Sequence, residues 1–114
     1  MVTSTETLLV LTNLPDAAAA RTLADHLVGE HLAACVNILA PCRSVYRWQG
    51  VVEEAEEVPL LIKTTAARYG ELEAAIRARH PYELPEIVAV PIAHGLPAYL
   101  GWIAAATTPD TTTC

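Results

Sequence analysis

The sequence lacks the features that mark several large classes of protein. None of its apolar runs approaches the roughly 20 residues that a helix needs to cross a bilayer. It has neither a glycine-rich phosphate loop nor a G-x-S-x-G nucleophile elbow, and nothing else supports catalysis, so we do not expect an enzyme. Residues 1–6 carry no basic side chain, which predicts that there is no signal peptide and that the protein is cytoplasmic.

Positive charge is scarce. The chain has 7 Lys and Arg residues against 13 Asp and Glu, a formal net charge of −6. This argues against nucleic acid or an anionic membrane as a partner. The only lysine, Lys63, follows the apolar residues 60–62, so its stem is expected to lie along a strand while its ammonium group reaches water. The alternative is an anion site or an ion pair with Glu83 or Glu86.

Cysteines are few, and none forms the C-x-x-C pair of zinc ribbons or thioredoxin-like proteins. The odd set of Cys35, Cys42 and Cys114 fits a reducing compartment better than a disulfide framework. Cys35 lies in an apolar strand segment, which predicts a buried, inert thiol rather than a nucleophile paired with His80. Cys42 follows Pro41 near a bend and is expected to be more exposed.

Hydrophobic residues make up 53% of the chain and charged residues 18%, which predicts one folded domain over 1–114. Its ordered core is expected to span about residues 7–106, with a polar tail at 107–114. Hydrophobic periodicity predicts the elements in order. They are a strand at 8–11, a helix at 16–30, strands at 33–39, 43–48 and 51–65, a helix at 69–79, a strand at 87–92 and a helix at 97–106.

This order is that of the α+β class: a ferredoxin-like βαββαβ sandwich with a long hairpin and a C-terminal helix. The helices would cover one face of an antiparallel sheet. A small doubly wound α/β domain is the alternative. The tight-turn signal Gln49-Gly50 disfavours it, because a two-residue turn joins only antiparallel strands.

The arms on either side of this turn are too long for the core. At about 3.3 Å per residue, each arm reaches on the order of 50 Å. The end that carries Tyr46 and Trp48 is therefore expected to leave the sheet, with bends near Pro41 and Pro59. Pro59 cannot donate a ladder hydrogen bond, which predicts a bulge or a sheet edge there. Exposed aromatic residues and a free edge predict pairing with another chain, the alternative being a hairpin folded back on its own domain.

The segment 80–87 combines rigidity with polar chemistry. Pro81 and Pro85 fix φ near about −65° and favour extended geometry in the residues before them, so the segment cannot be helical. Its imidazole, phenol and two carboxylates are those of His80, Tyr82, Glu83 and Glu86. These features predict either a functional site or a helix-ending turn with solvated acids.

Four blocks of the sequence, 32–38, 44–50, 61–65 and 80–87, resemble the CutA family of divalent-cation tolerance proteins, and 99–103 matches as well. The resemblance covers roughly residues 7–106. It implies a homotrimer of ferredoxin-like subunits, similar in architecture to the PII signalling proteins, whose long hairpins pair with neighbours. It also implies a role in tolerance to copper and other divalent ions.

The resemblance further implies a weakly bound Cu²⁺ or other divalent cation. The candidate ligands are His80, Glu83 and Cys35, with Glu86 as a further carboxylate. Copper-binding relatives use a cysteine after the first strand and paired histidines before the Pro-Tyr step. Thr12 and Arg79 stand at two of those positions here, and threonine is a poor copper ligand, so the implied binding is weak.

A PII-like sensor is the alternative function, with a small molecule held in a cleft between subunits. The candidate lining residues are Tyr46, Trp48, Lys63, His80, Tyr82, Glu86 and Trp102. No organic cofactor is indicated. In a third interpretation these side chains only hold the trimer together.

Overall fold

The computed structural model describes residues 6–109. Its elements are β1 (Thr7–Leu14), α1 (Ala17–Gly29), β2 (Cys35–Ile38), β3 (Cys42–Trp48), β4 (Val51–Thr65), α2 (Ala66–Arg79), β5 (Val88–Pro91) and α3 (Pro97–Ala106). This is the predicted order, while Cys114 and the rest of the tail from residue 110 lie outside the described residues. No helix within residues 6–109 is long and apolar enough to cross a membrane.

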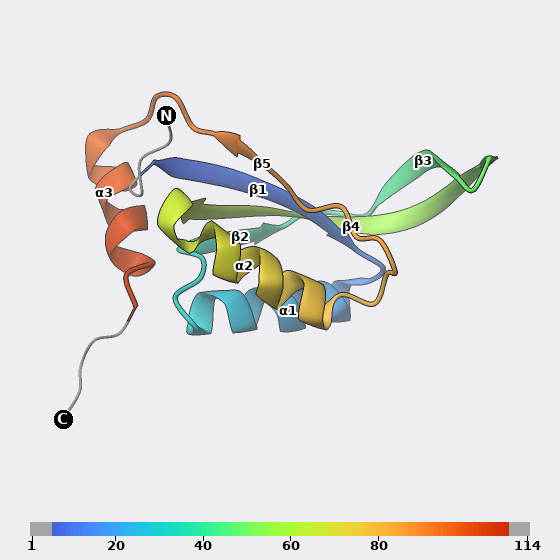
Figure 1. The fold of residues 1–114 in the computed structure, drawn as a ribbon, viewed down its shortest axis with the longest axis horizontal. Helices are drawn as coiled ribbons and strands as arrows, with labels where there is room; N and C mark the ends of the chain where they lie inside the picture. The colour runs from blue at the N-terminus through green and yellow to red at the C-terminus, as the bar shows by residue number, and fades with distance from the viewer. Residues whose placement is uncertain (1–5, 110–114) are drawn as a thin grey trace.

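The strands form an antiparallel sheet in the order β2-β4-β1-β5, and β3 joins it through β4. The longest strand, β4, pairs with β1 without interruption from Thr7↔Thr65 to Leu14↔Val58. Helices α1 and α2 cover one face of the sheet (Figure 1). The predicted α+β class and ferredoxin-like arrangement are therefore confirmed.

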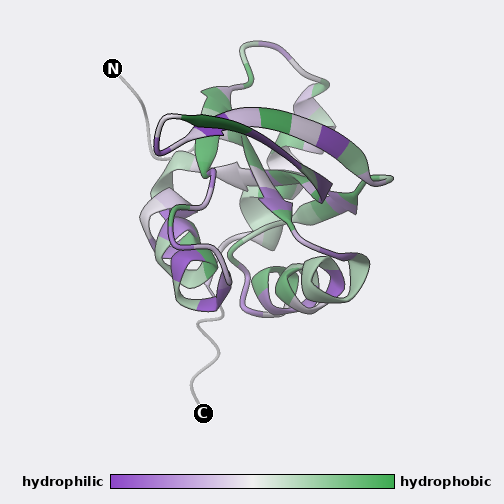
Figure 2. Ribbon diagram, turned by 90° about the vertical axis from the view of Figure 1, so that its right-hand side faces the viewer, coloured by the Kyte–Doolittle hydropathy of each residue, from purple (hydrophilic) through white to green (hydrophobic). Residues whose placement is uncertain are grey.

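The hydrophobic core lies between the sheet and these two helices. Alternate residues of the central strands face it, and Val10, Leu60 and Ile62 have no exposed surface. The helices contribute buried residues such as Leu27 and Ile76. In Figure 2 the two helices lie below the sheet, and both layers carry hydrophobic residues. Burial of one face thus fixes the register, because a slip of one residue would turn the apolar set outward.

Local sequence sets the ends of the helices. The side chain of Asp16 caps α1 by accepting a hydrogen bond from the Ala19 N–H at 2.8 Å. At the end of α2, His80 has extended backbone angles, with φ −78° and ψ 134°. This is the geometry that the following Pro81 imposes. The chain therefore leaves α2 abruptly and runs back along the sheet toward β5.

Strands β3 and β4 form the predicted long hairpin. Beyond the sheet, residues 51–57 of β4 pair with β3, from Cys42↔Glu57 to Trp48↔Val51. We call β3 together with residues 51–57 the distal hairpin. It projects from the body of a molecule that measures 50 × 33 × 24 Å (Figure 1). The turn residues Gln49 and Gly50 have φ of 51° and 83°, as a two-residue hairpin turn of type I′ requires.

The prediction of a bulge or sheet edge at Pro59 is wrong for β4 itself. Pro59 lies within a central strand and keeps the β1–β4 register. The extra residue lies on the opposite arm, where residues 39–41 face residues 58–59 between the pairings of Ile38 and Cys42. Because β1 holds the other side of β4, the irregularity falls in the arm that has β4 alone as its neighbour.

A candidate ligand groove

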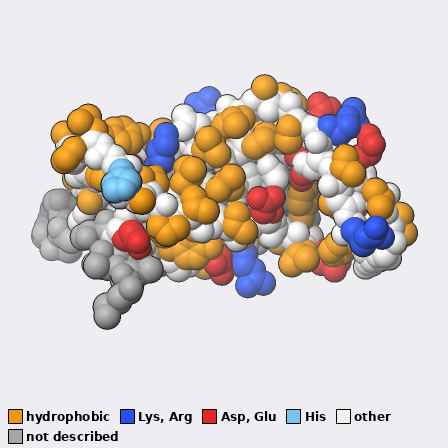
Figure 3. All heavy atoms as spheres, turned by 90° about the horizontal axis from the view of Figure 1, so that it is seen from above, with side chains coloured by type: hydrophobic (Ala, Val, Ile, Leu, Met, Phe, Trp, Pro, Cys, Tyr) orange, Lys and Arg blue, Asp and Glu red, His pale blue; other side chains and the backbone are white. Residues whose placement is uncertain are grey.

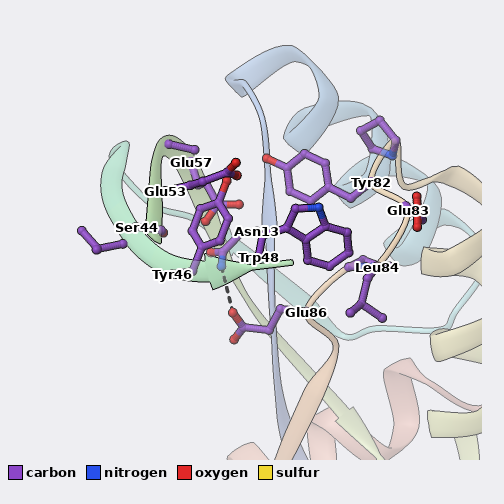
Figure 4. A pocket seen from close by; sticks show the side chains of 14 residues that line it. Asn13, Ser44, Tyr46, Trp48, Glu53, Glu57, Tyr82, Glu83, Leu84 and Glu86 are labelled. Atoms are coloured by element: carbon purple, nitrogen blue, oxygen red, sulfur yellow. Dashed lines mark hydrogen bonds between the residues drawn. The ribbon is translucent and has the colours of Figure 1, made fainter. Parts of the chain in front are cut away.

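The distal hairpin and the segment after α2 enclose a groove with a volume of about 1010 Å³. The hairpin forms one wall, residues 81–86 form the other, and the end of β1 contributes Asn13 (Figure 4). The lining residues are Asn13, Ser44, Val45, Tyr46, Trp48, Glu53, Ala55, Glu57 and 81–86. The groove thus lies where the hairpin leaves the sheet, and it unites two segments that the sequence indicated separately.

Three aromatic side chains line the groove. Tyr46 and Trp48 come from β3, where residues two apart share a face, and Tyr82 comes from the opposite wall (Figure 4). Tyr46 is 41% exposed, and the ring centroid of Tyr82 lies 4.7 Å from that of His80. The structure therefore brings together, within one chain, three residues that we predicted for a cleft between subunits.

Four carboxylates also line the groove, whereas no lysine, arginine or histidine does: Glu53, Glu57, Glu83 and Glu86. Glu86 accepts a hydrogen bond from Asn13 Nδ2 at 3.0 Å. Glu57 is buried, with 9% of its surface exposed, and takes no part in the three ion pairs found within residues 6–109. The groove therefore favours cations and disfavours phosphates and carboxylates.

Tyr82 stays a neutral phenol at physiological pH. Burial, followed by the nearby charge of Glu57, raises the pKa of Tyr82 from 10.0 to about 12. Both causes act against the phenolate, since burial removes the water that would solvate it and a carboxylate repels it. The hydroxyl group thus keeps its proton and remains a hydrogen-bond donor inside an acidic groove.

His80 lies behind the groove and connects Asn13, at the end of β1, to the wall formed by residues 81–86. It is 8% exposed, its Nε2 lies 2.6 Å from the Asn13 carbonyl oxygen, and its Nδ1 accepts a hydrogen bond from the Tyr82 N–H at 3.2 Å. Because Nδ1 accepts, the proton is on Nε2, which donates to Asn13. Both ring nitrogens are used within the protein, so a metal ion would have to displace one of these hydrogen bonds.

Three other predicted site residues lie away from the groove. Cys35 pairs with Lys63 in the sheet, and Lys63 Nζ donates a hydrogen bond to Asn37 Oδ1 at 2.8 Å. Cys35 is partly exposed rather than buried as predicted, because its neighbour Val36 is the residue that packs on the core. Trp102, on α3, is 47% exposed and contacts Tyr99 instead.

The predicted metal ligands are not assembled within one chain. Glu83 lines the groove, His80 is committed behind it, and Cys35 lies on β2. Across residues 6–109, no three His, Cys, Asp or Glu side chains are grouped so that they could hold a metal ion. Thr12 is buried with an unpartnered hydroxyl group, and Arg79 is exposed. The donor set therefore does not fit a closed copper site.

Sequence reasoning missed Asn13, Glu53 and Glu57. The two glutamates carried a usable signal, because the turn at residues 49–50 pairs Tyr46 with Glu53 across the hairpin. Glu57 then lies on the same face of β4 as Glu53, since side chains alternate along a strand. Asn13 carried no such signal, because it meets Glu86 from 73 positions away.

Known proteins resemble this chain in sequence and in structure. Residues 8–106 match the family described as CutA1 divalent ion tolerance protein. The divalent-cation tolerance protein CutA of Thermus thermophilus is 50% identical over 95 residues, which are 83% of this chain and 92% of that protein. A solved structure of the divalent cation tolerance protein from the same species has a TM-score of 0.88 and 48% identity, covering 90% of this chain and 99% of that one.

A more distant structure has the same fold. The periplasmic divalent cation tolerance protein CutA from Archaeoglobus fulgidus gives a TM-score of 0.86 at 33% identity, again covering 90% of this chain and 99% of that one. The family match extends from β1 to the end of α3. The resemblance noted in separate sequence blocks is thus confirmed over the whole domain, and the chain belongs to the CutA1 family of divalent ion tolerance proteins.

Proposed function

We propose that the protein works as a homotrimer in tolerance to divalent cations such as copper, and that it binds these ions weakly through the carboxylates of the groove. Family membership and the names of the relatives support this role. The observation that carries the proposal is the set of four carboxylates that line one groove without a basic residue.

The available ligand types favour weak binding. Carboxylate oxygens attract divalent cations through charge, whereas copper binds tightly where imidazole or thiolate groups converge. The nitrogens of His80 are engaged in hydrogen bonds, and the thiol of Cys35 lies on the sheet. Metal binding in the groove thus depends on the local negative charge rather than on a complete coordination shell. We propose a binding role for the protein and not a catalytic one.

Calorimetric titration with copper and zinc tests the metal proposal. Glu57→Gln removes one groove charge and should weaken binding several-fold, because each carboxylate contributes to the local potential. Glu56→Gln is the matched control, since Glu56 is the adjacent residue of β4 but is exposed and does not line the groove. Absence of heat from the wild type at millimolar ion, or equal loss in both variants, would contradict the proposal.

Two exposed apolar surfaces support assembly. The sheet face opposite the helices carries Val88 and Val90, each about half exposed, and the distal hairpin exposes Val45, Val51 and Val52 by 57% or more. Figure 3 shows hydrophobic side chains gathered over one side of the molecule. In a trimer, other copies of the chain would cover both apolar surfaces and pair with the free edge of β3. A monomer in sedimentation at micromolar concentration would contradict the trimer.

We propose that the protein is cytoplasmic. Cys35 and Cys42 are free thiols, which fits a reducing compartment. The Archaeoglobus fulgidus relative is called periplasmic, and cell fractionation distinguishes the two compartments. Detection of the native protein in the periplasmic fraction of fractionated cells would contradict this placement.

A small-molecule sensor is the second candidate function. The observation that favours it is the aromatic lining from Tyr46, Trp48 and Tyr82 beside a few polar groups, in a groove of about 1010 Å³. Such a lining suits an organic ligand, because the rings can contact its apolar surface while the polar groups orient it. Mass spectrometry of the gently purified protein tests it, because a bound metabolite would copurify, and a ligand-free protein from cells would count against it.

A further inference from the structure

We propose that the groove binds an organic cation, with an ammonium or guanidinium group held against the aromatic rings of Tyr46, Trp48 and Tyr82 and paired with the carboxylate of Glu57. This inference rests on the small-molecule function proposed above and names its ligand class. The inference goes beyond metal tolerance, because an organic cation, unlike a metal ion, can be bound without a set of coordinating ligands.

The charge at Glu57 is the first argument. Glu57 is only 9% exposed, and within residues 6–109 it has no ion pair. Its hydrogen-bonding neighbour is the phenol of Tyr82, which is neutral and supplies no positive charge. The other lining residues add Glu53, Glu83 and Glu86 but no basic group. A positively charged ligand would supply the counter-charge that residues 6–109 do not provide.

The aromatic lining is the second, independent argument. Tyr and Trp rings carry negative potential on their faces and attract cations within about 6 Å of the ring centroid. Trp48 and Tyr46 lie on one wall of the groove, and Tyr82 lies on the other (Figure 4). In the hairpin register Tyr46 stands directly opposite Glu53, which puts a ring and a carboxylate side by side on one face.

Other ligand classes fit less well. Nucleotides and carboxylic acids would face four like charges in the groove. A metal ion requires three or more convergent ligands for tight binding, and no such group exists in the described part of the chain. An alkylammonium or guanidinium ion needs only one close carboxylate and apolar contact for the rest of its surface. The cation can be a free small molecule or an Arg or Lys side chain of a second copy of this chain.

Fluorescence of Trp48 gives a direct measurement. Trp102→Phe leaves Trp48 as the only tryptophan, because the chain has two. In this background, tetramethylammonium and methylguanidinium should each change the emission with saturation. The neutral analogue tert-butanol and equimolar sodium chloride should not. A saturating response to tert-butanol equal to that of tetramethylammonium would overturn the proposal, because the groove would then recognise shape rather than charge.

Variants test the residues. Glu57→Gln should lower the affinity for both cations by about tenfold or more, because a charge-assisted contact contributes about 1.5–3 kcal/mol. Glu56→Gln should leave the affinity unchanged, and the thermal unfolding of both variants checks that they fold. If Glu57→Gln does not fold, Tyr46→Leu is the second variant. It should lower the affinity for both cations, because it removes one aromatic ring from the groove. An unchanged affinity in the folded variant would overturn the proposal.

A second measurement distinguishes the two sources of the cation. Should the small cations give no response while Glu57→Gln, but not Glu56→Gln, dissociates the assembly in sedimentation, the cation is a side chain of a second copy. No response and no dissociation would overturn the proposal. Copper calorimetry on the same variants distinguishes metal binding from organic-cation binding. A protein that binds copper but no organic cation would contradict this inference and leave the metal proposal standing.

Discussion

The two halves of β4 belong to one strand but have opposite surroundings. Residues 58–65 pair with β1, residues 60–63 also pair with β2, and Leu60 and Ile62 are fully buried under the helices. Residues 51–57 pair with β3, and most of their side chains are exposed. Glu57 stands at the boundary and is buried although charged. The comparison teaches that the inner half builds the core, whereas the distal half contributes side chains that line the groove.

The largest expected difference between the halves is in stability. Ile62→Ala removes fully buried methyl groups and leaves a cavity, so it should lower the free energy of unfolding by about 2–5 kcal/mol. Val52→Ala, at a side chain that is 60% exposed, should change it by less than about 0.5 kcal/mol. Urea unfolding at one fixed protein concentration measures both, and equal losses would show that the halves do not differ.

His80 connects the segment after α2 to Asn13, which pairs with Pro59 close to the boundary between the halves. Replacing His80 with alanine removes the hydrogen bonds to the Asn13 carbonyl group and the Tyr82 N–H. Leaving these groups unpaired should cost about 1–3 kcal/mol of unfolding free energy. His26→Ala, at a partly exposed position of α1, is the control and should cost little. A His80→Ala protein as stable as the wild type would mean that this link does not support the groove.

Backbone geometry at the tip of the distal hairpin has a smaller effect. Gly50 has φ of 83°, and a Cβ there would meet no atom within 4 Å. Gly50→Ala should therefore cost about 1 kcal/mol through backbone strain alone. Gly29→Ala, in the last turn of α1 with equally open space, should be neutral or stabilising. Thermal unfolding compares the two, and a stabilising Gly50→Ala would contradict the turn geometry.

The smallest effect near neutral pH concerns Tyr82. Its pKa is raised from 10.0 to about 12 in the folded protein, so folding favours the protonated phenol. Its contribution to stability is therefore complete below pH 10 and is lost as the pH rises toward 12. Tyr82→Phe should make unfolding less sensitive to pH in that window. Phenolate absorbance measures the pKa, and titration of the Tyr82 phenol near pH 10 would contradict its placement beside Glu57.

Much of the fold followed from the sequence. Ala20, Leu23 and Leu27 recur at helical spacing and are buried on α1. The turn at Gln49-Gly50 and the length of its arms predicted a hairpin that leaves the sheet. The site was predicted in part, because Tyr46, Trp48 and Tyr82 lie on local segments that already pointed to it. The prediction at Pro59 was wrong, because a proline shows only that its own nitrogen cannot donate a hydrogen bond. It does not show which of the two paired strands contains the extra residue.

The sequence by itself determined the order of the elements, the buried face of each and the negative charge, because these depend on neighbours along the chain. Only the tertiary structure decided that His80 serves as a support, that Lys63 and Trp102 lie outside the groove, and that Glu57 is buried. These outcomes depend on contacts between distant segments, such as that of Asn13 with Glu86, 73 positions apart. Periodicity specifies which way a side chain points from its own element, and packing alone specifies what it meets.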